Sequence, residues 1–300
     1  MLLRMTLVAS GFDLPAFVAA RPPRAAGFIV TLYGDAVVPR GGELGMGAII
    51  ETCADVGISE TLVRTAVSRL VAAGQLAGVR RGRRSFYRLT PEAAAEFAAA
   101  AARIYAEPVP CGWRLLIGPD GVLDAAGLAR LRPGVALGPA RGPVPRGAAV
   151  LEGDVTGAGP ALRALAAQLW DLPAHAAALA GVRDRFAPLI ALAGAMLPAQ
   201  ALALRLLLVH DWRLAVLADP RLPPEAVPPD WPGLAARAVF TSLYKALTPA
   251  SEARIAAVFE AARGPLPAAT AASRARLEAL DSSQGRMNPE LICDALGDIK

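Results

Sequence analysis

The residues best suited to chemistry in this chain are arginines gathered in one short window. Between Thr61 and Pro91 there is no acidic residue, and the seven arginines of the window are Arg64, Arg69, Arg80, Arg81, Arg83, Arg84 and Arg88. Without these seven of the 31 basic side chains, 24 basic and 26 acidic groups remain, a net charge of −2 instead of +5. Guanidinium groups bind phosphate and guanine in a bidentate manner. Such a local excess of positive charge predicts binding to a polyanion.

The elements that must position these arginines have the order of a helix-turn-helix motif. Apolar residues at helical spacing from about Arg24 predict a first helix, which a loop rich in glycine and proline ends. A second helix is predicted by apolar residues at positions i, i+3, i+4 and i+7, namely Met46, Ile49, Ile50 and Cys53. Gly57 can close that helix, and Ser59 is a suitable N-cap for a third helix that runs to Ala73. Two helices joined by a short turn that contains glycine are typical of this motif.

The third predicted helix has an apolar face and a face suited to reading DNA. The apolar side chains are Leu62, Val63, Ala66, Val67 and Leu70. The other face carries short polar groups and arginines, namely Thr61, Arg64, Thr65, Ser68 and Arg69. Side chains of these types contact base edges and phosphates when a helix lies in the major groove. We therefore expect this face to contact DNA.

A hairpin rich in arginine is predicted directly after this helix. Its strand-like runs are Leu76 to Arg80 and Arg83 to Thr90, and Gly82 permits the positive φ that a tight turn needs. The predicted contacts of the hairpin with phosphates or a minor groove are Arg80, Arg81, Arg83, Arg84, Ser85 and Tyr87. Helix, turn, helix and hairpin together predict a winged helix on double-stranded DNA. The residues leave open a merely solvated hairpin, and binding to RNA or to an acidic protein.

Two sets of motifs in this chain resemble the PaaX family of bacterial repressors. The first set is Phe28 to Asp35 (FIVTLYGD), Ser59 to Leu70 (SETLVRTAVSRL) and Arg81 to Thr90 (RGRRSFYRLT). The second set is His210 to Arg213 (HDWR), Asp219 to Pro223 (DPRLP) and Pro229 to Gly233 (PDWPG). The resemblance covers roughly Gly27 to Ala262. It implies a repressor of phenylacetic-acid catabolic operons that an aryl-acyl-CoA, such as phenylacetyl-CoA, releases from DNA.

The fold class that the sequence predicts is mostly α with small α+β parts, divided into several domains. The expected parts are a winged-helix domain at residues 22–90, a connecting helix at 91–107, a small middle domain at 108–158, a helical effector or dimerisation domain at 159–270, and a mobile tail at 271–300. The resemblance implies that the middle domain is ferredoxin-like, akin to a CRISPR-associated nuclease fold.

The middle domain is expected to have a structural or dimerising role rather than a nuclease role. Its predicted elements are strands at Trp113 to Ile117 and Ala148 to Leu151, with a helix at Leu123 to Leu131 between them. Asp120 and Asp154 are separate carboxylates without the spacing of a metal-ligand set.

The C-terminal region is predicted to be a bundle that could enclose a ligand between its helices. The expected helices open at Pro160, Val182, Ala199, Pro232 and Thr248, where Thr248 is an N-cap before Pro249. The candidate effector-binding residues are Arg205, His210, Trp212, Arg213 and Trp231. Tryptophans can stack on an aryl group, and arginines can bind phosphates.

No catalytic residue, metal or cofactor is predicted. His210 and Asp211 have no nucleophile at a recognisable spacing, so the pair indicates a hydrogen-bond network. Cys53, Cys111 and Cys293 are odd in number and scattered, which fits a reducing cytoplasm. Residues 186–204 are uncharged, but prolines divide them, which indicates buried helices rather than a membrane span.

We therefore expect a cytoplasmic transcriptional repressor that is not an enzyme. A homodimer is expected because two wings on one palindromic operator must lie about one helical turn apart. Two alternatives remain open. One is a regulator whose C-terminal region only dimerises, and the other is an enzyme that acts on a CoA thioester or on nucleic acid.

Overall fold

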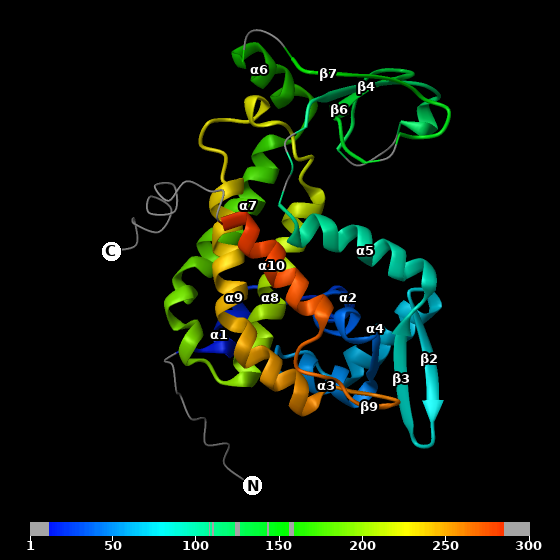
Figure 1. The fold of residues 1–300 in the computed structure, drawn as a ribbon, viewed down its shortest axis with the longest axis vertical. Helices are drawn as coiled ribbons and strands as arrows, with labels where there is room; N and C mark the ends of the chain where they lie inside the picture. The colour runs from blue at the N-terminus through cyan, green and yellow to red at the C-terminus, as the bar shows by residue number, and fades with distance from the viewer. Residues whose placement is uncertain are drawn as a thin grey trace.

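The structure, a computed structural model, describes residues 12–107, 109, 111–123, 127–142, 144–155 and 159–284. These residues are mostly helical, with three small antiparallel sheets (Figure 1). This agrees with the predicted mostly α class with small sheets. Within the described residues, none of the helices combines the length and the apolar character that a membrane span requires.

The first module contains the helices and the hairpin that the sequence predicts. Its helices are α1 (Leu14–Ala20), α2 (Ala25–Leu32), α3 (Met46–Ala54) and α4 (Glu60–Ala72), with the π-helical η1 (Tyr33–Val37) and the 3-10 helix η2 (Val38–Arg40) continuing α2. Its strands are β1 (Glu43–Gly45), β2 (Leu76–Arg81) and β3 (Arg84–Leu89), in the order β1-β3-β2. Strand β1, which the sequence analysis did not predict, pairs with β3 and anchors the hairpin to the start of α3.

Local signals in the sequence explain the boundaries of these elements. Gly57 after α3 has a φ of 75°, and Gly82 in the hairpin turn has a φ of 62°. Both values lie in the left-handed region, which glycine adopts without steric cost. The Ser59 hydroxyl caps α4 by accepting a hydrogen bond from the Leu62 amide at 3.4 Å. Leu62 itself is 56% exposed, so its assignment to the apolar face of α4 was wrong.

Helix α5 (Pro91–Tyr105) joins the hairpin to the rest of the molecule (Figure 1). The Thr90 hydroxyl accepts a hydrogen bond from the Ala93 amide at 3.2 Å, so it caps the helix. Because α5 follows β3 with only Thr90 between them, its first turn is coupled closely to the hairpin.

The middle region is a four-stranded sheet in the order β5-β6-β4-β7. Its strands are β4 (Trp113–Ile117), β5 (Ala129–Arg132), β6 (Val135–Pro139) and β7 (Ala149–Gly153), and the 3-10 turn η3 (Asp120–Val122) precedes β5. The predicted helix at Leu123 to Leu131 was wrong, since Ala129 to Leu131 belong to β5. Gly134, with a φ of 74°, allows the turn through which β5 pairs with β6. Asp120 supports this turn, because its carboxylate accepts from the Gly134 amide at 2.7 Å and pairs with Arg130.

The C-terminal region is a helical bundle. Its elements are α6 (Gly159–Leu169), α7 (Leu172–Phe186), η4 (Ala187–Ala195), α8 (Pro198–Ala218), η5 (Pro224–Ala226), α9 (Gly233–Val258), β8 (Glu260–Ala261), β9 (Gly264–Pro265) and α10 (Ala271–Gln284). The predicted helix start at Thr248 was wrong, because α9 continues through Pro249. Leu247 and Ile255 are both fully buried, so packing on each side of the proline outweighs the hydrogen bond that proline cannot donate.

The predicted mobile tail differs from the structure over Ala271–Gln284, which form α10. Leu280 on this helix is fully buried, and Arg276 is bonded to carbonyls of η1. The burial of Leu280 and the charged hydrogen bonds of Arg276 explain why this segment forms a helix packed on the rest of the molecule. The remaining tail, residues 285–300, lies outside the described residues.

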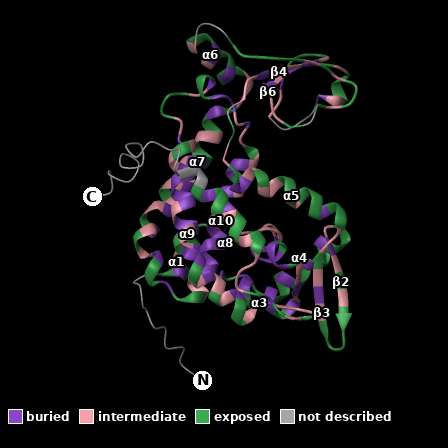
Figure 2. Ribbon diagram, in the orientation of Figure 1, coloured by how far each residue is buried: buried purple, intermediate pink, exposed green. Residues whose placement is uncertain are grey.

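One hydrophobic core unites the first module with the bundle (Figure 2). Phe28 of α2, Trp212 of α8 and Phe240 of α9 all belong to it, and each is at most 3% exposed. The helices of the first module therefore pack directly on the bundle.

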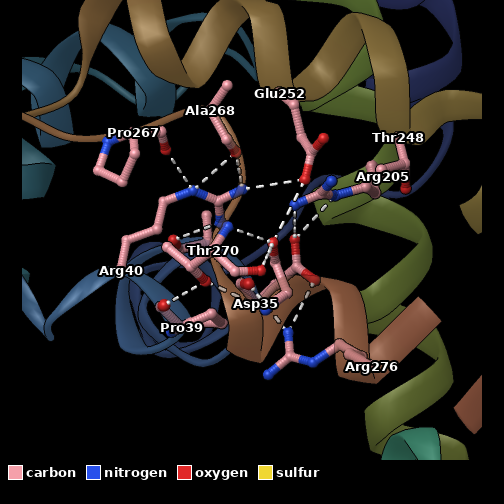
Figure 3. A network of polar contacts seen from close by, with 12 residues as sticks. Asp35, Pro39, Arg40, Arg205, Thr248, Glu252, Pro267, Ala268, Thr270 and Arg276 are labelled. Carbon is pink, nitrogen blue, oxygen red and sulfur yellow. Dashed lines mark hydrogen bonds and ion pairs between the residues drawn. The ribbon is translucent and has the colours of Figure 1, made fainter. Parts of the chain in front are cut away.

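Asp35 lies at the centre of a buried polar network between these parts (Figure 3). Its Oδ2 accepts from Arg205 Nε at 2.9 Å and lies 2.8 Å from Arg205 Nη2. Its Oδ1 accepts from the hydroxyls of Tyr105 and Tyr244, both at 2.9 Å. Arg276 Nη1 donates to the backbone oxygen of Asp35 at 2.9 Å. The donors thus come from α5, α8, α9 and α10.

Asp35 is ionised in this network. Burial opposes the charge, but Arg205 and Arg276 outweigh burial and lower the pKa of Asp35 below its ordinary value. Arg40 extends the network to the segment before α10, because its Nε donates to the carbonyl of Pro267 at 2.9 Å (Figure 3). A single carboxylate thereby helps to fix four helices.

We predict that Asp35→Asn costs on the order of 3–5 kcal/mol of unfolding free energy, because it leaves the Arg205 charge buried without a counter-charge. Urea unfolding of the full chain measures this. Asp184→Asn is the matched control, since Asp184 pairs with Arg183 at 2.7 Å but is 63% exposed. Its cost should stay below ~1 kcal/mol. Equal costs for the two variants would contradict a central role for Asp35.

Candidate nucleic-acid interface

The polar side chains predicted to contact DNA share one exposed face of α4. Thr61, Arg64, Thr65, Ser68 and Arg69 are all exposed. The opposite face of the helix is buried, with Val63, Ala66 and Val67 in the core of the first module. The helix therefore presents its arginines and hydroxyls to solvent on a rigid support.

Contacts within this face leave its side chains able to bind a partner. Arg64 pairs with Glu60 one turn earlier at 2.7 Å, and each of these side chains is 57% exposed. Exposed pairs of this kind contribute little and are screened by salt, so Arg64 can exchange Glu60 for another anion. The Thr65 hydroxyl donates to the Thr61 carbonyl at 2.9 Å, and its oxygen remains free to accept.

The hairpin carries the other predicted contacts. Arg80, Arg81, Arg83 and Arg84 are exposed, whereas Ser85 and Tyr87 are half-buried. The Tyr87 carbonyl accepts from the Tyr33 hydroxyl at 2.9 Å, and the Tyr87 ring packs over Gly78, where an added Cβ would lie 3.1 Å from it. Tyr87 therefore also supports the hairpin, and the arginines supply its charge.

Arg84 has a partner that the sequence analysis did not identify. Its two terminal nitrogens donate to the two carboxylate oxygens of Glu260 in β8, each at 2.7 Å. Both side chains are about half exposed, at 52% and 44%. The residues are 176 positions apart, so no local pattern could have paired them.

A groove of about 300 Å³ joins the face of α4 to the hairpin. Arg64, Arg83, Arg84, Ser85 and Glu260 all line it. Arg64 of the helix and Arg83 and Arg84 of the hairpin thus lie on one surface, which is suited to binding a phosphate chain electrostatically.

The candidate effector residues lie in three places. Arg205 is fully buried against Asp35, whereas His210 and Arg213 lie between α8 and α2. His210 Nδ1 is 3.0 Å from the Thr31 hydroxyl, and Arg213 Nε donates to the same hydroxyl at 2.9 Å. Arg205 and His210 are buried, whereas Arg213 is half-buried.

The two tryptophans among these candidates lie together. Trp212 and the half-buried Trp231 line a cavity of about 420 Å³ at the end of α8. Trp212 stacks on Phe240 with ring centroids 5.0 Å apart. Arg221 and Arg237 also line this cavity and were not predicted as effector residues.

No metal site is visible in the part of the chain that the structure describes, since no three His, Cys, Asp or Glu residues gather there. Cys53 and Cys111 are both free thiols, and Cys293 lies outside the described residues. Burial raises the pKa of the Cys53 thiol to about 12, so this thiol stays protonated at neutral pH.

Comparison with known proteins gives two matches to families. Residues 24–93 match the family described as PaaX-like protein, and residues 170–257 match the PaaX-like protein C-terminal domain. The transcriptional repressor PaaX of Escherichia coli (strain K12) is 30% identical over 282 residues, which span 84% of this chain and 89% of that protein. A solved structure, the uncharacterized protein Rv0674 from Mycobacterium tuberculosis, is 23% identical and covers 80% of this chain and 99% of its own, with a TM-score of 0.42.

The burial of His210 predicts a loss of stability in weak acid. Burial, followed by the charge of Arg213, lowers the pKa of His210 to about 4, against ~6.5 in the unfolded chain. The unfolded state therefore binds the extra proton, and stability is complete above pH ~6.5 and falls as the pH drops towards 4.

We predict that the wild-type protein loses about 2 kcal/mol more than His210→Gln between pH 7 and pH 5. Urea unfolding at the two pH values measures the difference. The same loss in both proteins would show that His210 titrates normally.

Proposed function

This chain belongs to the PaaX family, and we propose that it is a transcriptional repressor that binds double-stranded DNA through α4 and the β2–β3 hairpin. One observation carries the proposal, namely that Arg64 of α4 lines one groove with Arg83, Arg84 and Ser85 of the hairpin. The name of the Escherichia coli relative, a transcriptional repressor, supports the same function.

In this proposal residues 22–90 form a winged-helix domain. Helix α4 enters the major groove, where Arg64, Thr65, Ser68 and Arg69 approach bases and Thr61 lies beside them. The hairpin is the wing, whose arginines bind phosphates of the adjacent backbone. Residues 91–107 connect it to a middle domain at 108–158, for which the resemblance implies a ferredoxin-like fold, and to the bundle at 159–270.

Glu260 has a defined role in the proposed DNA complex. Its carboxylate neutralises Arg84 in the free protein, as a phosphate would in the complex. Because the pair is about half exposed, the exchange of carboxylate for phosphate has a small cost. Glu260 thus lowers the affinity for any anion that does not also engage the other arginines.

The proposed effector is an aryl-acyl-CoA, such as phenylacetyl-CoA, that releases the repressor from an operator of aromatic-acid catabolism. A thioester achieves this by binding the arrangement that does not bind DNA more tightly. To move the population from mostly bound to mostly released requires about 5.5 kcal/mol of differential affinity. We further propose a cytoplasmic homodimer without catalytic activity.

The proposal is tested by titrating the protein onto DNA from upstream of its own operon, at two salt concentrations, with and without phenylacetyl-CoA. Tight binding that weakens with salt and is released by the intact thioester supports the whole proposal. Tight binding that the thioester does not affect removes the effector. Equal affinity for random DNA contradicts the repressor, and turnover of the thioester would indicate an enzyme.

We predict that Arg83→Ala weakens binding to all DNA sequences and flattens the slope of log K against log salt by about one unit, because one phosphate contact is lost. Glu260→Gln should tighten binding, because it frees Arg84. Arg274→Ala removes one exposed charge on α10 and serves as the control. A salt slope that does not change in Arg83→Ala would place the wing outside the interface.

We predict that Arg64→Ala relaxes the sequence preference by about 1–3 kcal/mol, because a base contact is lost from the recognition helix. Competition between operator and random duplexes measures this preference. An equal loss of affinity for both duplexes would assign Arg64 to a phosphate instead.

A further inference from the structure

The C-terminal end of α5 is held by side chains that line the cavity beside Trp212. Each of the last three carbonyls of the helix accepts one hydrogen bond from such a side chain. The pairs are Arg221 Nη2 with Arg103 O, Trp212 Nε1 with Ile104 O at 2.9 Å, and Arg237 Nη2 with Tyr105 O at 3.3 Å. Guanidinium groups are favoured at this end of a helix, where the backbone carries partial negative charge. The side chains that line the cavity therefore also hold the C-terminal end of α5.

The cavity has the size and lining of a small-molecule site. Its volume of about 420 Å³ lies in the usual range for such sites. Two tryptophans, Trp212 and Trp231, supply flat apolar surface, and Val216 and Leu222 extend it. An aromatic or similarly flat group can stack there.

The same cavity carries an excess of positive charge. Arg141, Arg221 and Arg237 line it, against the two carboxylates of Glu107 and Asp219. Burial, followed by the charges of Arg103 and Arg141, lowers the pKa of Arg221 to about 10. An anion beside Arg221 would relieve this repulsion.

Arg221 is also held in an unusual state. Its φ is 56°, in the left-handed region, and its Nε is buried without a hydrogen-bond partner among the described residues. Backbone strain and an unsatisfied donor both cost free energy, and such features concentrate at binding sites. Both features occur at Arg221, one of the three residues that line the cavity and donate to the α5 carbonyls.

We propose that this cavity binds an organic anion with a flat apolar body, and that the bound anion withdraws the cavity donors from the end of α5. The identity of the anion, an aryl-acyl thioester or its parent carboxylate, rests on the proposed function. The acyl group stacks on the tryptophans, and the anionic part binds guanidinium groups that now donate to the helix.

Helix α5 connects the proposed anion site directly to the hairpin. The helix begins one residue after β3, and its N-cap Thr90 donates to the Gly74 carbonyl between α4 and β2 at 2.7 Å. Loss of the three contacts loosens the far end of the helix, which then pivots about the hydrogen bond from the Tyr105 hydroxyl to Asp35. The hairpin at its near end then moves relative to α4.

The site is tested by isothermal titration calorimetry with phenylacetyl-CoA and, separately, phenylacetate. Leu234 lines the cavity and is 62% exposed, so Leu234→Asp adds a repelling charge without disturbing the core. Leu214→Asp makes the same change at a leucine of α8 that is 47% exposed and outside the cavity. We expect Leu234→Asp to raise the Kd of the probe that binds at least tenfold, and Leu214→Asp to leave it unchanged.

Equal Kd values in the three proteins, or no binding of either probe to the wild type, overturn the site. In the first case the effector proposal survives, provided that the thioester still releases DNA. In the second case, the affinity of the effector-free protein for operator DNA tests the repressor function by itself.

Coupling to α5 is tested by hydrogen exchange of the full chain. The bound probe should speed exchange of the last amides of α5 and of the hairpin at least threefold, and leave α1 unchanged. Binding with unchanged or slower exchange at the end of α5 overturns the coupling, even where the site itself is supported.

Discussion

The buried carboxylate of Asp35 is the constraint on which the rest of the structure depends. A charged group inside a protein is tolerated only when several donors surround it. Here the donors come from α5, α8, α9 and α10, so these helices must meet at the end of α2 for Asp35 to be satisfied. The first module is consequently not an independently oriented domain joined to the bundle by a flexible linker. Its orientation relative to the bundle is set by a network that excludes water.

This fixed orientation brings the bundle into contact with the proposed DNA-binding surface. Arg254 near the end of α9 pairs with Glu51 of α3 at 2.8 Å, and Glu260 just beyond it pairs with Arg84 of the hairpin. Helix α5 provides a second connection, from the cavity to the other end of the same hairpin. The bundle thus contacts both elements that flank α4, so a change within the bundle reaches the proposed DNA-binding surface through these contacts.

Local chemistry made part of this fold predictable. The cap at Ser59, the glycines at positions 57 and 82, and the apolar spacing of α3 act within a few residues, so they identified the helices, the hairpin and its exposed arginines. Some failures involve distant partners, such as the packing that carries α9 through Pro249 and the burial of Leu280 in α10. Others are local, namely the exposure of Leu62 and the strand β5 in place of a helix. Arg205 gave one usable signal, since a lone charge within the apolar run of α8 requires a buried partner. Its partner, 170 positions away, could come only from the structure.

The arginines of this chain act in three ways, which differ in burial and in hydrogen-bond partner. Those of the hairpin are exposed and screened, so phosphate can replace their partners at small cost. Arg205 is fully buried with its counter-charge, so it holds the frame in every state. Arg221 and Arg237 at the cavity donate to backbone carbonyls of α5, and Arg237 is almost as buried as Arg205. Hydrogen bonds from charged donors contribute ~1.5–3 kcal/mol each and a neutral one ~1 kcal/mol. Together with the bond from Trp212, the contacts at the end of α5 therefore amount to about 4–7 kcal/mol, which the contacts of the bound anion must offset. Fully buried ion pairs at this position would cost too much free energy for a ligand to break, and exposed pairs would contribute too little to hold the end of α5.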